Sequence, residues 1–246
     1  MIDIRTYSII EDRAVRVPVE ACFPFLEEHG HVISLVGGGG KTTLMLHLAQ
    51  RFAARGMKTV VMTTTRIARP ERFVRTMDGC RACWAAGEYA VCGEEAPGGK
   101  LCAPEQNVIA ALLGEADAVL IEADGAKCMA VKAPESHEPV ILPETDIVIG
   151  VAGVHVLGEP VDEVCFRAER VKALLCCDGE HRLTADDLAE ILLSADGTRK
   201  SVEDRTYYTV VNKCDDEGWL RQGEEIARAL ENRGHLRICL TCLKPE

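Results

Sequence analysis

The part of this sequence best suited to chemistry is a run of four glycines followed by a lysine and two threonines. Backbone without a Cβ lets amide N–H groups approach phosphate oxygens closely, a lysine amine can reach the terminal phosphates, and a threonine hydroxyl can ligate Mg²⁺. The segment therefore predicts a loop that binds a nucleoside triphosphate, GTP or ATP, together with its magnesium ion. Its residues are Gly37, Gly38, Gly39, Gly40, Lys41, Thr42 and Thr43.

The sequence on both sides of the glycines supplies the strand and the helix that such a loop needs. Val32–Val36 is an apolar run typical of a buried strand, and apolar residues recur at helical spacing from Leu44 to Ala53, before Gly56. The N-terminus of that helix would add its partial positive charge to the site. The alternative is a flexible linker that happens to precede a helix, which would require all these features to coincide by chance.

The loop departs from the usual G-x-x-x-x-G-K-[ST] pattern at one position. That pattern asks for a glycine five residues before Gly40, where this sequence has Leu35. The loop instead has the form G-x-x-G-K-T-T. It is similar to the shortened loop of the Mur ligases, which bind ATP and activate carboxylates.

Two carboxylates lie at the end of the apolar run Asp117–Ala123. Glu122 and Asp124 are spaced i, i+2, so in an extended chain they face the same side. We expect Glu122 to hold Mg²⁺ with Thr42, and Asp124 to orient the attacking group, so that both act in catalysis with Lys41. An ordinary Asp-Gly turn with a solvated Glu122 is the alternative, but an unpaired charge inside an apolar strand is costly.

A second motif typical of nucleotide-binding proteins follows the strand expected at Thr206–Val211, near the end of the chain. Asn212, Lys213 and Asp215 fit the N-K-x-D pattern of guanine-nucleotide proteins. A carboxylate at Asp215 can accept hydrogen bonds from guanine N1–H and its exocyclic amine, the Asn212 amide can fix the loop or approach N7, and the Lys213 stem can cover the base. The alternative is a polar turn in which Asp215 or Asp216 caps the next helix.

Further polar residues follow the expected strands at positions where they could assist. Lys127, Lys132, His137 and Glu138 lie in a loop after the acidic strand and could line the triphosphate or a second substrate. Thr64, with Thr63 and Thr65, ends a strand beside the glycine loop and could hold Mg²⁺ or a water molecule. Arg167 could supply a further cation, although a surface position is the default for both His137 and Arg167.

The elements that must position these residues alternate between strands and helices. Such alternation predicts an α/β fold with a mostly parallel, doubly wound sheet, helices on both faces and ligands at the carboxyl ends of the strands, as in P-loop NTPases. We expect an N-terminal appendage at 1–30 and a P-loop domain at 31–246 with a Cys- and Gly-rich excursion at about 66–103. Further expected strands are Lys58–Thr65, Asp146–Ala152 and His235–Leu240, and expected helices are Ala21–His29, Pro104–Glu115, Glu163–Leu175, Ala185–Leu193 and Glu217–Arg233.

Composition restricts the class of partner. The formal net charge of −11 argues against a nucleic-acid-binding surface, which needs clustered Lys and Arg. No stretch has the length of a membrane span, and the first residues lack the apolar region of a signal peptide. We therefore expect a cytoplasmic protein that binds a nucleotide and neither nucleic acid nor membrane.

The 12 cysteines are numerous for a chain of 246 residues. In a reducing compartment they would be free thiols or metal ligands. Cys80, Cys83, Cys92 and Cys102 form the one cluster that could hold zinc or another thiophilic metal, although scattered reduced thiols are the favoured interpretation. A second C-x-x-C ends at Cys242, in a strand-like run that would point the two thiols to opposite faces.

Taken in order, seven segments resemble the YqeC family over about residues 31–216. The family is described as accessory proteins of selenium-dependent molybdenum hydroxylases. The resemblance implies a P-loop protein that helps to make or insert the selenium-containing molybdenum cofactor in bacteria, with a molybdenum hydroxylase or a cofactor-maturation protein as partner. It does not extend to the cysteine cluster or to the first thirty residues. The segments are "LVGGGGKTT", "MTTTRI", "IEADGAK", "KAPESHEP", "IGVAG", "FRAER" and "VNKCD".

Three functions are compatible with these motifs. The leading expectation is a Mg²⁺-dependent GTP or ATP hydrolase that acts as a maturation factor. The second is an ATP-dependent ligase or kinase acting on a small cofactor precursor, as the loop similar to that of the Mur ligases indicates. The third is a carrier that binds nucleotide or selenium without hydrolysis.

Overall fold

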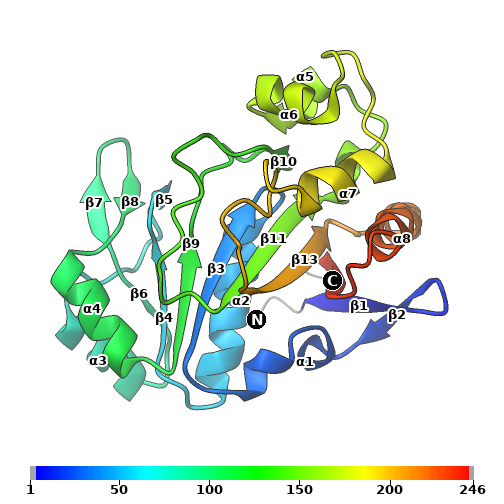
Figure 1. The fold of residues 1–246 in the computed structure, drawn as a ribbon. Coiled ribbons are helices and arrows are strands. Elements are labelled where there is room, and N and C mark those ends of the chain that lie inside the picture. Colours follow the sequence, from blue (N-terminus) through cyan, green and yellow to red (C-terminus); the bar gives the residue numbers. More distant parts are fainter. Residues whose placement is uncertain (1–3, 244–246) are drawn as a thin grey trace.

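A nine-stranded sheet forms the centre of the computed structural model, which describes residues 4–243 (Figure 1). Its strands are β1 (Arg5–Ile10), β2 (Arg13–Val17), β3 (His31–Gly37), β4 (Thr59–Thr63), β6 (Ala90–Val91), β9 (Ala118–Glu122), β11 (Ile147–Gly153), β13 (Thr206–Asn212) and β14 (Ile238–Cys242). Their order is β2-β1-β14-β13-β11-β3-β9-β4-β6, and the strands from β14 to β6 are parallel. The predicted α/β class with a mostly parallel central sheet is confirmed.

Helices cover both faces because buried parallel strands alternate their apolar side chains between the two faces. Ile33 and Leu120 pack on the face covered by α1 and α2, whereas Val60 and Val119 pack on the face covered by α3 and α4. The helices are α1 (Val19–Cys22), α2 (Lys41–Ala54), α3 (Met77–Ala85), α4 (Gln106–Glu115), α5 (Val161–Val164), α6 (Ala168–Leu175), α7 (Ala185–Leu193) and α8 (Glu217–Glu231), with 3₁₀ turns η1 (Pro24–Glu27) and η2 (Val154–Val156).

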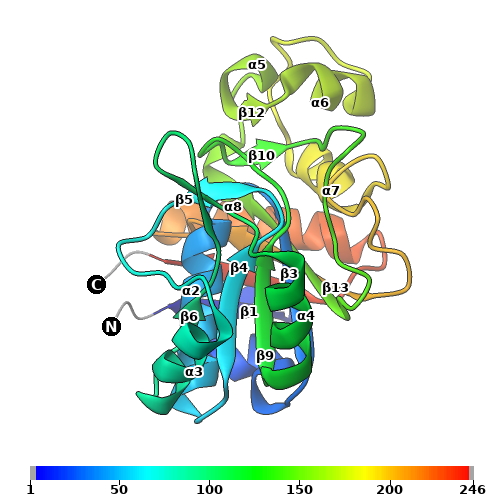
Figure 2. The same cartoon turned by 90° about the vertical axis from the view of Figure 1, so that its left-hand side faces the viewer.

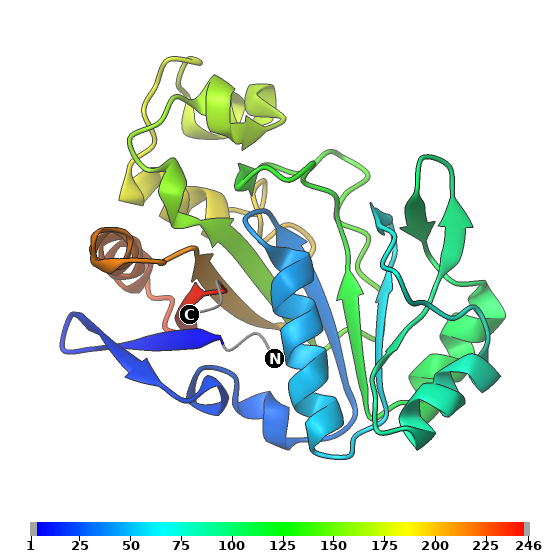
Figure 3. The ribbon, with the colours of Figure 1, turned by 180° about the vertical axis from the view of Figure 1, so that it is seen from behind.

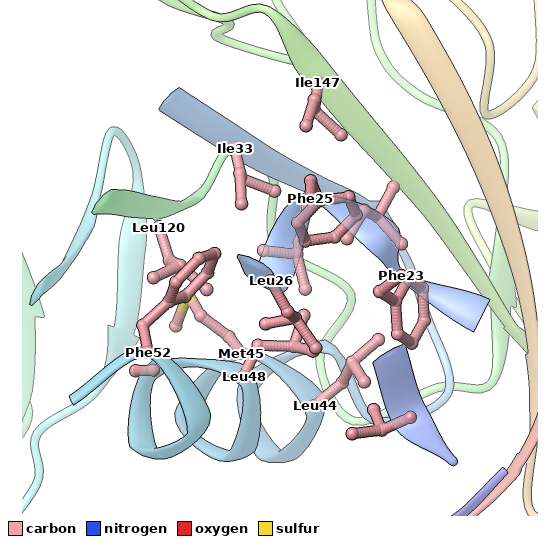
Figure 4. Close-up of a cluster of buried hydrophobic side chains, with 14 of the residues drawn as sticks. Phe23, Phe25, Leu26, Ile33, Leu44, Met45, Leu48, Phe52, Leu120 and Ile147 are labelled. Carbon is pink, nitrogen blue, oxygen red and sulfur yellow. The ribbon is translucent and has the colours of Figure 1, made fainter. Parts of the chain in front are cut away.

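The core beneath α2 fixes the helix against the strands that carry the candidate site. Figure 3 shows α2 lying along this face of the sheet, and Figure 4 shows Phe23, Phe25 and Phe52 gathered around its inner surface. Phe25 stacks on Phe52 with 6.3 Å between ring centroids. Aromatic contacts of this kind add to the free energy gained by burying the rings. The N-terminal end of α2 is therefore held at the carboxyl end of β3.

Residues 1–30, expected as an appendage, extend the main sheet in their described part. β1 pairs antiparallel with β14 and β2 closes a hairpin on β1, so the two strands form one edge of the sheet. In place of the single helix expected at Ala21–His29, α1 and η1 follow, and their Phe23 and Phe25 enter the core described above. The segment thus contributes to the support of α2.

The excursion at about 66–103 contains more regular structure than expected. It includes α3, the edge strand β6, and a separate antiparallel sheet in the order β5 (Arg66–Ala68), β8 (Lys100–Cys102) and β7 (Glu94–Ala96). Strands of two or three residues are too short for a periodic pattern to reveal. The β7–β8 hairpin rises beyond the carboxyl ends of the central strands (Figure 1).

The expected helix Glu163–Leu175 is interrupted in its middle. Cys165–Phe166 forms the short strand β12, which pairs with β10 (Val131–Lys132), and Arg167 adopts a left-handed φ of 62° before α6 begins. A residue whose backbone is in the left-handed region cannot continue a right-handed helix. Helices α5 and α6 lie above the carboxyl end of the sheet (Figure 2).

Of the four cysteines of the candidate metal cluster, Cys80 lies beside Cys92, but the described structure does not assemble the set into a metal site. Cys80 and Cys92 are fully buried in the apolar cluster under α3 and α4, and the Cys102 thiol donates to the Glu94 carbonyl at 3.5 Å. Within residues 4–243 no three His, Cys, Asp or Glu side chains lie where they could share a metal ion. All 12 cysteines are free thiols.

None of the helices in the described part of the chain is long and apolar enough to cross a membrane.

Candidate functional site

The four glycines form a tightly packed turn between β3 and α2. Gly37 and Gly40 have φ values of 93° and 115°, which L side chains rarely adopt. A Cβ on Gly37 would collide with the Val151 carbonyl of β11, and one on Gly40 would lie 2.5 Å from Nδ2 of Asn212. The turn is therefore fixed by close backbone approach on several sides, unlike a flexible linker.

The amide N–H groups of this turn fall into two sets. Those of Gly37, Gly38 and Gly39 donate to protein acceptors: Asp124 Oδ2 at 3.1 Å, the Val151 carbonyl at 2.8 Å and the Met129 carbonyl at 3.1 Å. The first N–H groups of α2 have no intrahelical partner, and no side chain caps the helix. Donors for an anion are therefore the amides from Gly40 onward, and the earlier glycines hold the shape of the turn.

The Lys41 ammonium is buried beside both predicted carboxylates. Its Nζ lies 3.0 Å from Asp124 Oδ1 and 3.8 Å from Glu122 Oε1, and it also donates to the Gly37 carbonyl. Only 4% of the residue is exposed. The structure thus brings Lys41 together with Glu122 and Asp124, which lie far from it in the sequence.

Thr42 and Glu122 face each other at the start of α2. The Thr42 hydroxyl donates to Glu122 Oε2 at 2.6 Å. Burial raises the pKa of the Glu122 carboxyl above its ordinary value, and the charge of Lys41 and the hydrogen bond from Thr42 oppose this shift only in part. A hydroxyl and a carboxylate side by side are suitable ligands for Mg²⁺, which is commonly bound by one or two protein oxygens plus substrate phosphates and water.

Asp124 lies deeper than Glu122 and belongs to a buried row of alternating charges. Its Oδ2 is 3.1 Å from Lys132 Nζ, which is also 2.6 Å from Glu138 Oε2, and Arg167 reaches the two oxygens of Glu138 at 2.7 and 3.1 Å. Asp124 is 2% exposed and is absent from the described residues that line the cavities below. Asp124 thus contacts both the Lys41 ammonium and the amide of Gly37, and its expected role of orienting the attacking group stays a prediction.

A cavity of about 500 Å³ opens at the N-terminus of α2. Its walls come from the glycine turn, the end of β9, the loop after β9 and the small sheet β5–β8. The described residues lining it include Gly38, Gly39, Gly40, Lys41, Thr42, Thr43, Arg66, Lys100, Glu122, Lys127 and Lys213. We call it the α2 cavity.

A second cavity, of about 410 Å³, adjoins the first on the side of β13 and α8. We call it the β13 cavity. Asn212, Lys213 and Asp215 line it, together with His155 and Trp219, which belong to none of the motifs identified in the sequence. The other described residues that line the β13 cavity are Gly40, Thr43 and Leu243. Gly40, Thr43 and Lys213 belong to both cavities, so the two spaces meet at the start of α2.

Asn212 ties the end of β13 to the glycine turn. Its Nδ2 donates to the Gly39 carbonyl at 2.6 Å, and its Oδ1 accepts from the Thr241 hydroxyl at 2.9 Å. This is the loop-fixing role considered for Asn212, since both ends of the amide are engaged by the protein. Asp216 caps α8 by accepting from the Trp219 amide at 2.9 Å, so the carboxylate that lines the cavity, Asp215, is not the helix cap.

His155 presents a neutral imidazole to the β13 cavity. Burial, and then the positive charge of Lys213, lower the pKa of His155 below its ordinary value of 6.5. Among residues 4–243 its buried Nδ1 has no hydrogen-bond partner. A neutral imidazole carries one donor and one acceptor nitrogen, so His155 can make a hydrogen bond to a ligand in this cavity.

The four remaining candidates from the sequence differ in whether they line one of the two cavities. Lys127 lines the α2 cavity, whereas His137 is exposed and lines neither. The Thr64 hydroxyl donates to the Val140 carbonyl at 2.7 Å, and Arg167 is engaged by Glu138 as described. Of these four residues, the structure places Lys127 at the site, Arg167 in the charge row behind it, and Thr64 and His137 outside it.

Comparison with known proteins places the chain in a family. A model of the YqeC protein family matches residues 33–169, which is more than half of the chain and includes the glycine turn, the acidic strand and the loop that follows it. A protein of Escherichia coli strain K12 called uncharacterized protein YqeC is 31% identical in an alignment of 213 residues, and the match covers 79% of this chain and 78% of the relative. The chain therefore belongs to the YqeC family.

Proposed function

We propose that this protein is a P-loop NTPase that binds a nucleoside triphosphate with Mg²⁺ across the two cavities and hydrolyses it. The observation that supports this most strongly is that the cavities meet at Gly40, Thr43 and Lys213. Donors for phosphate lie on one side of this junction and polar groups suited to a base lie on the other. A nucleotide likewise carries anionic phosphates at one end and a polar base at the other.

The phosphates would lie against the start of α2. Amide N–H groups from Gly40 to Thr43 converge there, and the helix contributes its partial positive charge. Lys41 would exchange its contact with the Gly37 carbonyl for the terminal phosphates while Asp124 keeps the ammonium in place. The magnesium ion would be held by Thr42 and Glu122, and when bound it would neutralise charge that develops on the terminal phosphates.

Hydrolysis requires a water molecule to be ordered beside the terminal phosphate. Of the described residues that line the α2 cavity, Glu122 alone is a carboxylate. Its Oε2 accepts from Thr42, which leaves Oε1 to accept from a water molecule.

The base would occupy the β13 cavity. The Asp215 carboxylate can accept from guanine N1–H and the exocyclic amine, whereas adenine offers no such pair of donors. Trp219 and the Lys213 stem supply apolar surface for the faces of the ring, and His155 can make one more hydrogen bond. These features favour GTP, and the shortened glycine loop favours ATP, so both nucleotides belong in the test.

We further propose, on the family resemblance described above, that hydrolysis serves the maturation of the selenium-containing molybdenum cofactor. Binding or hydrolysis would then control delivery to a molybdenum hydroxylase or to another maturation protein. Copurification of such a client with the protein in the presence of a non-hydrolysable triphosphate, but not of the diphosphate, would support this role. Equal recovery in both states would contradict it.

The hydrolase proposal is tested by calorimetry with GTP, ATP and their diphosphates in Mg²⁺, combined with an assay of phosphate release. We expect a triphosphate to bind and to be hydrolysed without a second substrate, and Lys41→Ala to weaken binding about 100-fold. Lys58→Ala is the matched control, because Lys58 precedes β4 at the opposite end of the sheet. Unchanged nucleotide affinity of Lys41→Ala would contradict the proposal.

A further inference from the structure

The α2 cavity carries cations on a wall that is separate from the glycine turn. Arg66 and Lys100 come from the small sheet formed by β5 and β8, and Lys127 comes from the loop after β9. We call these three residues the cationic wall. All three are exposed.

The small sheet presents Arg66 and Lys100 on one face. In its antiparallel register Arg66 lies opposite Cys102 and Ala68 opposite Lys100, while Ile67 pairs with Leu101. Because opposite residues share a face and successive residues alternate, Arg66 and Lys100 project together. Ile67 and Leu101 are 6% and 0% exposed, so the other face is anchored in the protein.

Acidic residues on the same small sheet neutralise other arginines. Arg69 Nη1 lies 2.9 Å from Glu95 Oε1, and Arg75 Nη2 lies 3.3 Å from the same oxygen. By contrast, among residues 4–243 the structure shows no ion pair on Arg66 or Lys100. Their charges are therefore available to a ligand.

The lining of the α2 cavity has more positive charge than one nucleotide requires. Five cationic side chains and one carboxylate line it, although the whole chain has a net charge of −11. Asp124 already balances Lys41 at 3.0 Å. Because a magnesium ion cancels about half of a triphosphate's charge, a bound nucleotide would leave the cationic wall partly unneutralised.

The cationic wall also lies away from the place proposed for the base. None of its three residues is among the described residues that line the β13 cavity. Lys100 and Glu122, the expected magnesium ligand, line the same cavity. An anion on this wall would therefore share the α2 cavity with the terminal phosphate, away from the base.

We propose that the cationic wall binds a second ligand that carries a phosphate dianion, either inorganic phosphate or a phosphate monoester, while the nucleotide is bound. This proposal rests on the proposed nucleotide site and adds a substrate class to it. A planar guanidinium and two ammonium groups in one cavity wall supply the positive charge and the N–H donors that the oxygens of a phosphate group accept. Such a ligand would make the site suitable for a kinase or ligase as well as for a hydrolase.

The test begins with protein saturated with Mg²⁺ and GMPPNP or AMPPNP, whichever binds. Inorganic phosphate and ribose 5-phosphate are then titrated separately by calorimetry. We expect at least one of them to bind without displacing the analogue, and the tighter of the two identifies free phosphate or a monoester as the ligand. Failure of both to bind to the saturated protein would overturn the proposal.

The variants Arg66→Gln and Lys100→Gln assign the binding to the cationic wall. Each should weaken phosphate binding about tenfold while the affinity for the analogue changes less than threefold. Arg69→Gln is the matched control, because Arg69 directly follows β5, is exposed and is paired with Glu95. An equal loss of analogue affinity would overturn the proposal, since the wall would then serve the nucleotide's own phosphates.

The same experiments distinguish failure of the proposed nucleotide site from failure of the proposed phosphate site on the cationic wall. If neither analogue binds to the wild-type protein, the proposed function fails at that step. Phosphate titrated into the nucleotide-free protein would still support the cationic wall if Arg66→Gln and Lys100→Gln abolish binding and Lys41→Ala does not. If Lys41→Ala alone abolishes it, the anion binds at the glycine turn and the proposal is wrong.

Discussion

The Thr42 hydroxyl and the Glu122 carboxylate, 80 residues apart in the chain, meet at 2.6 Å. The contact exists because β3 and β9 are adjacent parallel strands with Leu35 opposite Glu122, so that α2 starts beside the carboxyl end of β9. Strand pairing therefore places a hydroxyl and a carboxylate side by side, and both are oxygen ligands of the kind that the proposed magnesium site needs.

Glu122→Gln should preserve nucleotide binding and greatly reduce hydrolysis. The amide keeps the shape of the side chain and can still accept the hydrogen bond from Thr42, but it removes the negative charge from the proposed magnesium site. We expect phosphate release to fall at least 100-fold, which corresponds to about 2.7 kcal/mol in the activation free energy. Glu115→Gln is the control, because Glu115 pairs with Arg81 on the exposed side of α4. Hydrolysis by Glu122→Gln at the wild-type rate would remove Glu122 from the mechanism.

The pH dependence of folding should also respond to this carboxyl. Its folded pKa is raised, chiefly by burial, so the folded protein binds the proton more tightly than the unfolded chain. The stability from this group is fully present below its unfolded pKa, near 4.5, and is lost as the pH rises through the raised folded value. Without nucleotide or Mg²⁺, the Tm of Glu122→Gln relative to wild type should therefore increase between pH 4 and pH 8. A constant Tm difference across this range would contradict the shift.

Asp215→Asn should change the preferred base. The amide presents donors where the carboxylate presented acceptors, so xanthine should replace guanine as the better partner. We expect the ratio of the affinities for GTP and xanthosine triphosphate to move about 100-fold towards the xanthine nucleotide, as measured by calorimetry.

A neighbouring aspartate provides the control for this exchange. Asp216 caps α8 through the Trp219 amide, so Asp216→Ala should lower the free energy of unfolding by about 1 kcal/mol without changing the base preference. If Asp215→Asn weakens both nucleotides equally, Asp215 does not contact the base edge.

Asn212→Ala should destabilise the fold and weaken nucleotide binding together. The substitution leaves the Gly39 carbonyl and the Thr241 hydroxyl without the amide that now joins them, at a residue that is 2% exposed. Unsatisfied buried groups of this kind cost about 1–3 kcal/mol each. Urea unfolding should reveal this loss, and Asn232→Ala, at the exposed end of α8, should change stability by less than about 0.5 kcal/mol. A normal nucleotide affinity in Asn212→Ala would show that the amide is not needed to shape the turn.

The sequence predicted the central sheet because its strands are apolar runs separated by helical patterns. Val148 and Leu120 belong to such runs, and both are buried in the sheet as expected. The glycines and the acids after β9 could likewise be assigned to one edge, because the carboxyl ends of parallel strands meet there.

Contacts between loops could not be predicted in the same way. Arg167 was expected within a helix, yet its left-handed backbone and its pairing with Glu138, 29 residues away, end that helix pattern. No local periodicity encodes a contact between two irregular segments. The deep position of Asp124 follows from Lys132, which a spacing argument also could not place.

Glu138 lies between two cations in the row of charges behind the site. Glu138 is 8% exposed and is bound by Lys132 and by both terminal nitrogens of Arg167. Burial alone would raise the pKa of this carboxyl, but its hydrogen bond to Lys132 and the charges of Lys132 and Arg167 outweigh burial and lower it. The ionised form therefore stabilises the fold above the unfolded pKa, near 4.5, and this contribution is lost as the pH falls through the lowered folded value.

Glu138→Gln should consequently cost about 3–5 kcal/mol at pH 7, because the buried Lys132 and the half-buried Arg167 lose a charged partner. The difference in Tm between wild type and Glu138→Gln should shrink as the pH is lowered from 6 to 3, since wild type then loses the same charge. Glu135→Gln is the control, because the Glu135 carboxylate pairs with Arg170, whose side chain is 44% exposed, and its loss should have little effect on stability. A Tm difference that stays constant down to pH 3 would mean that Glu138 stabilises the site by its shape alone, and that Lys132 remains in place beside Asp124 without the charge of Glu138.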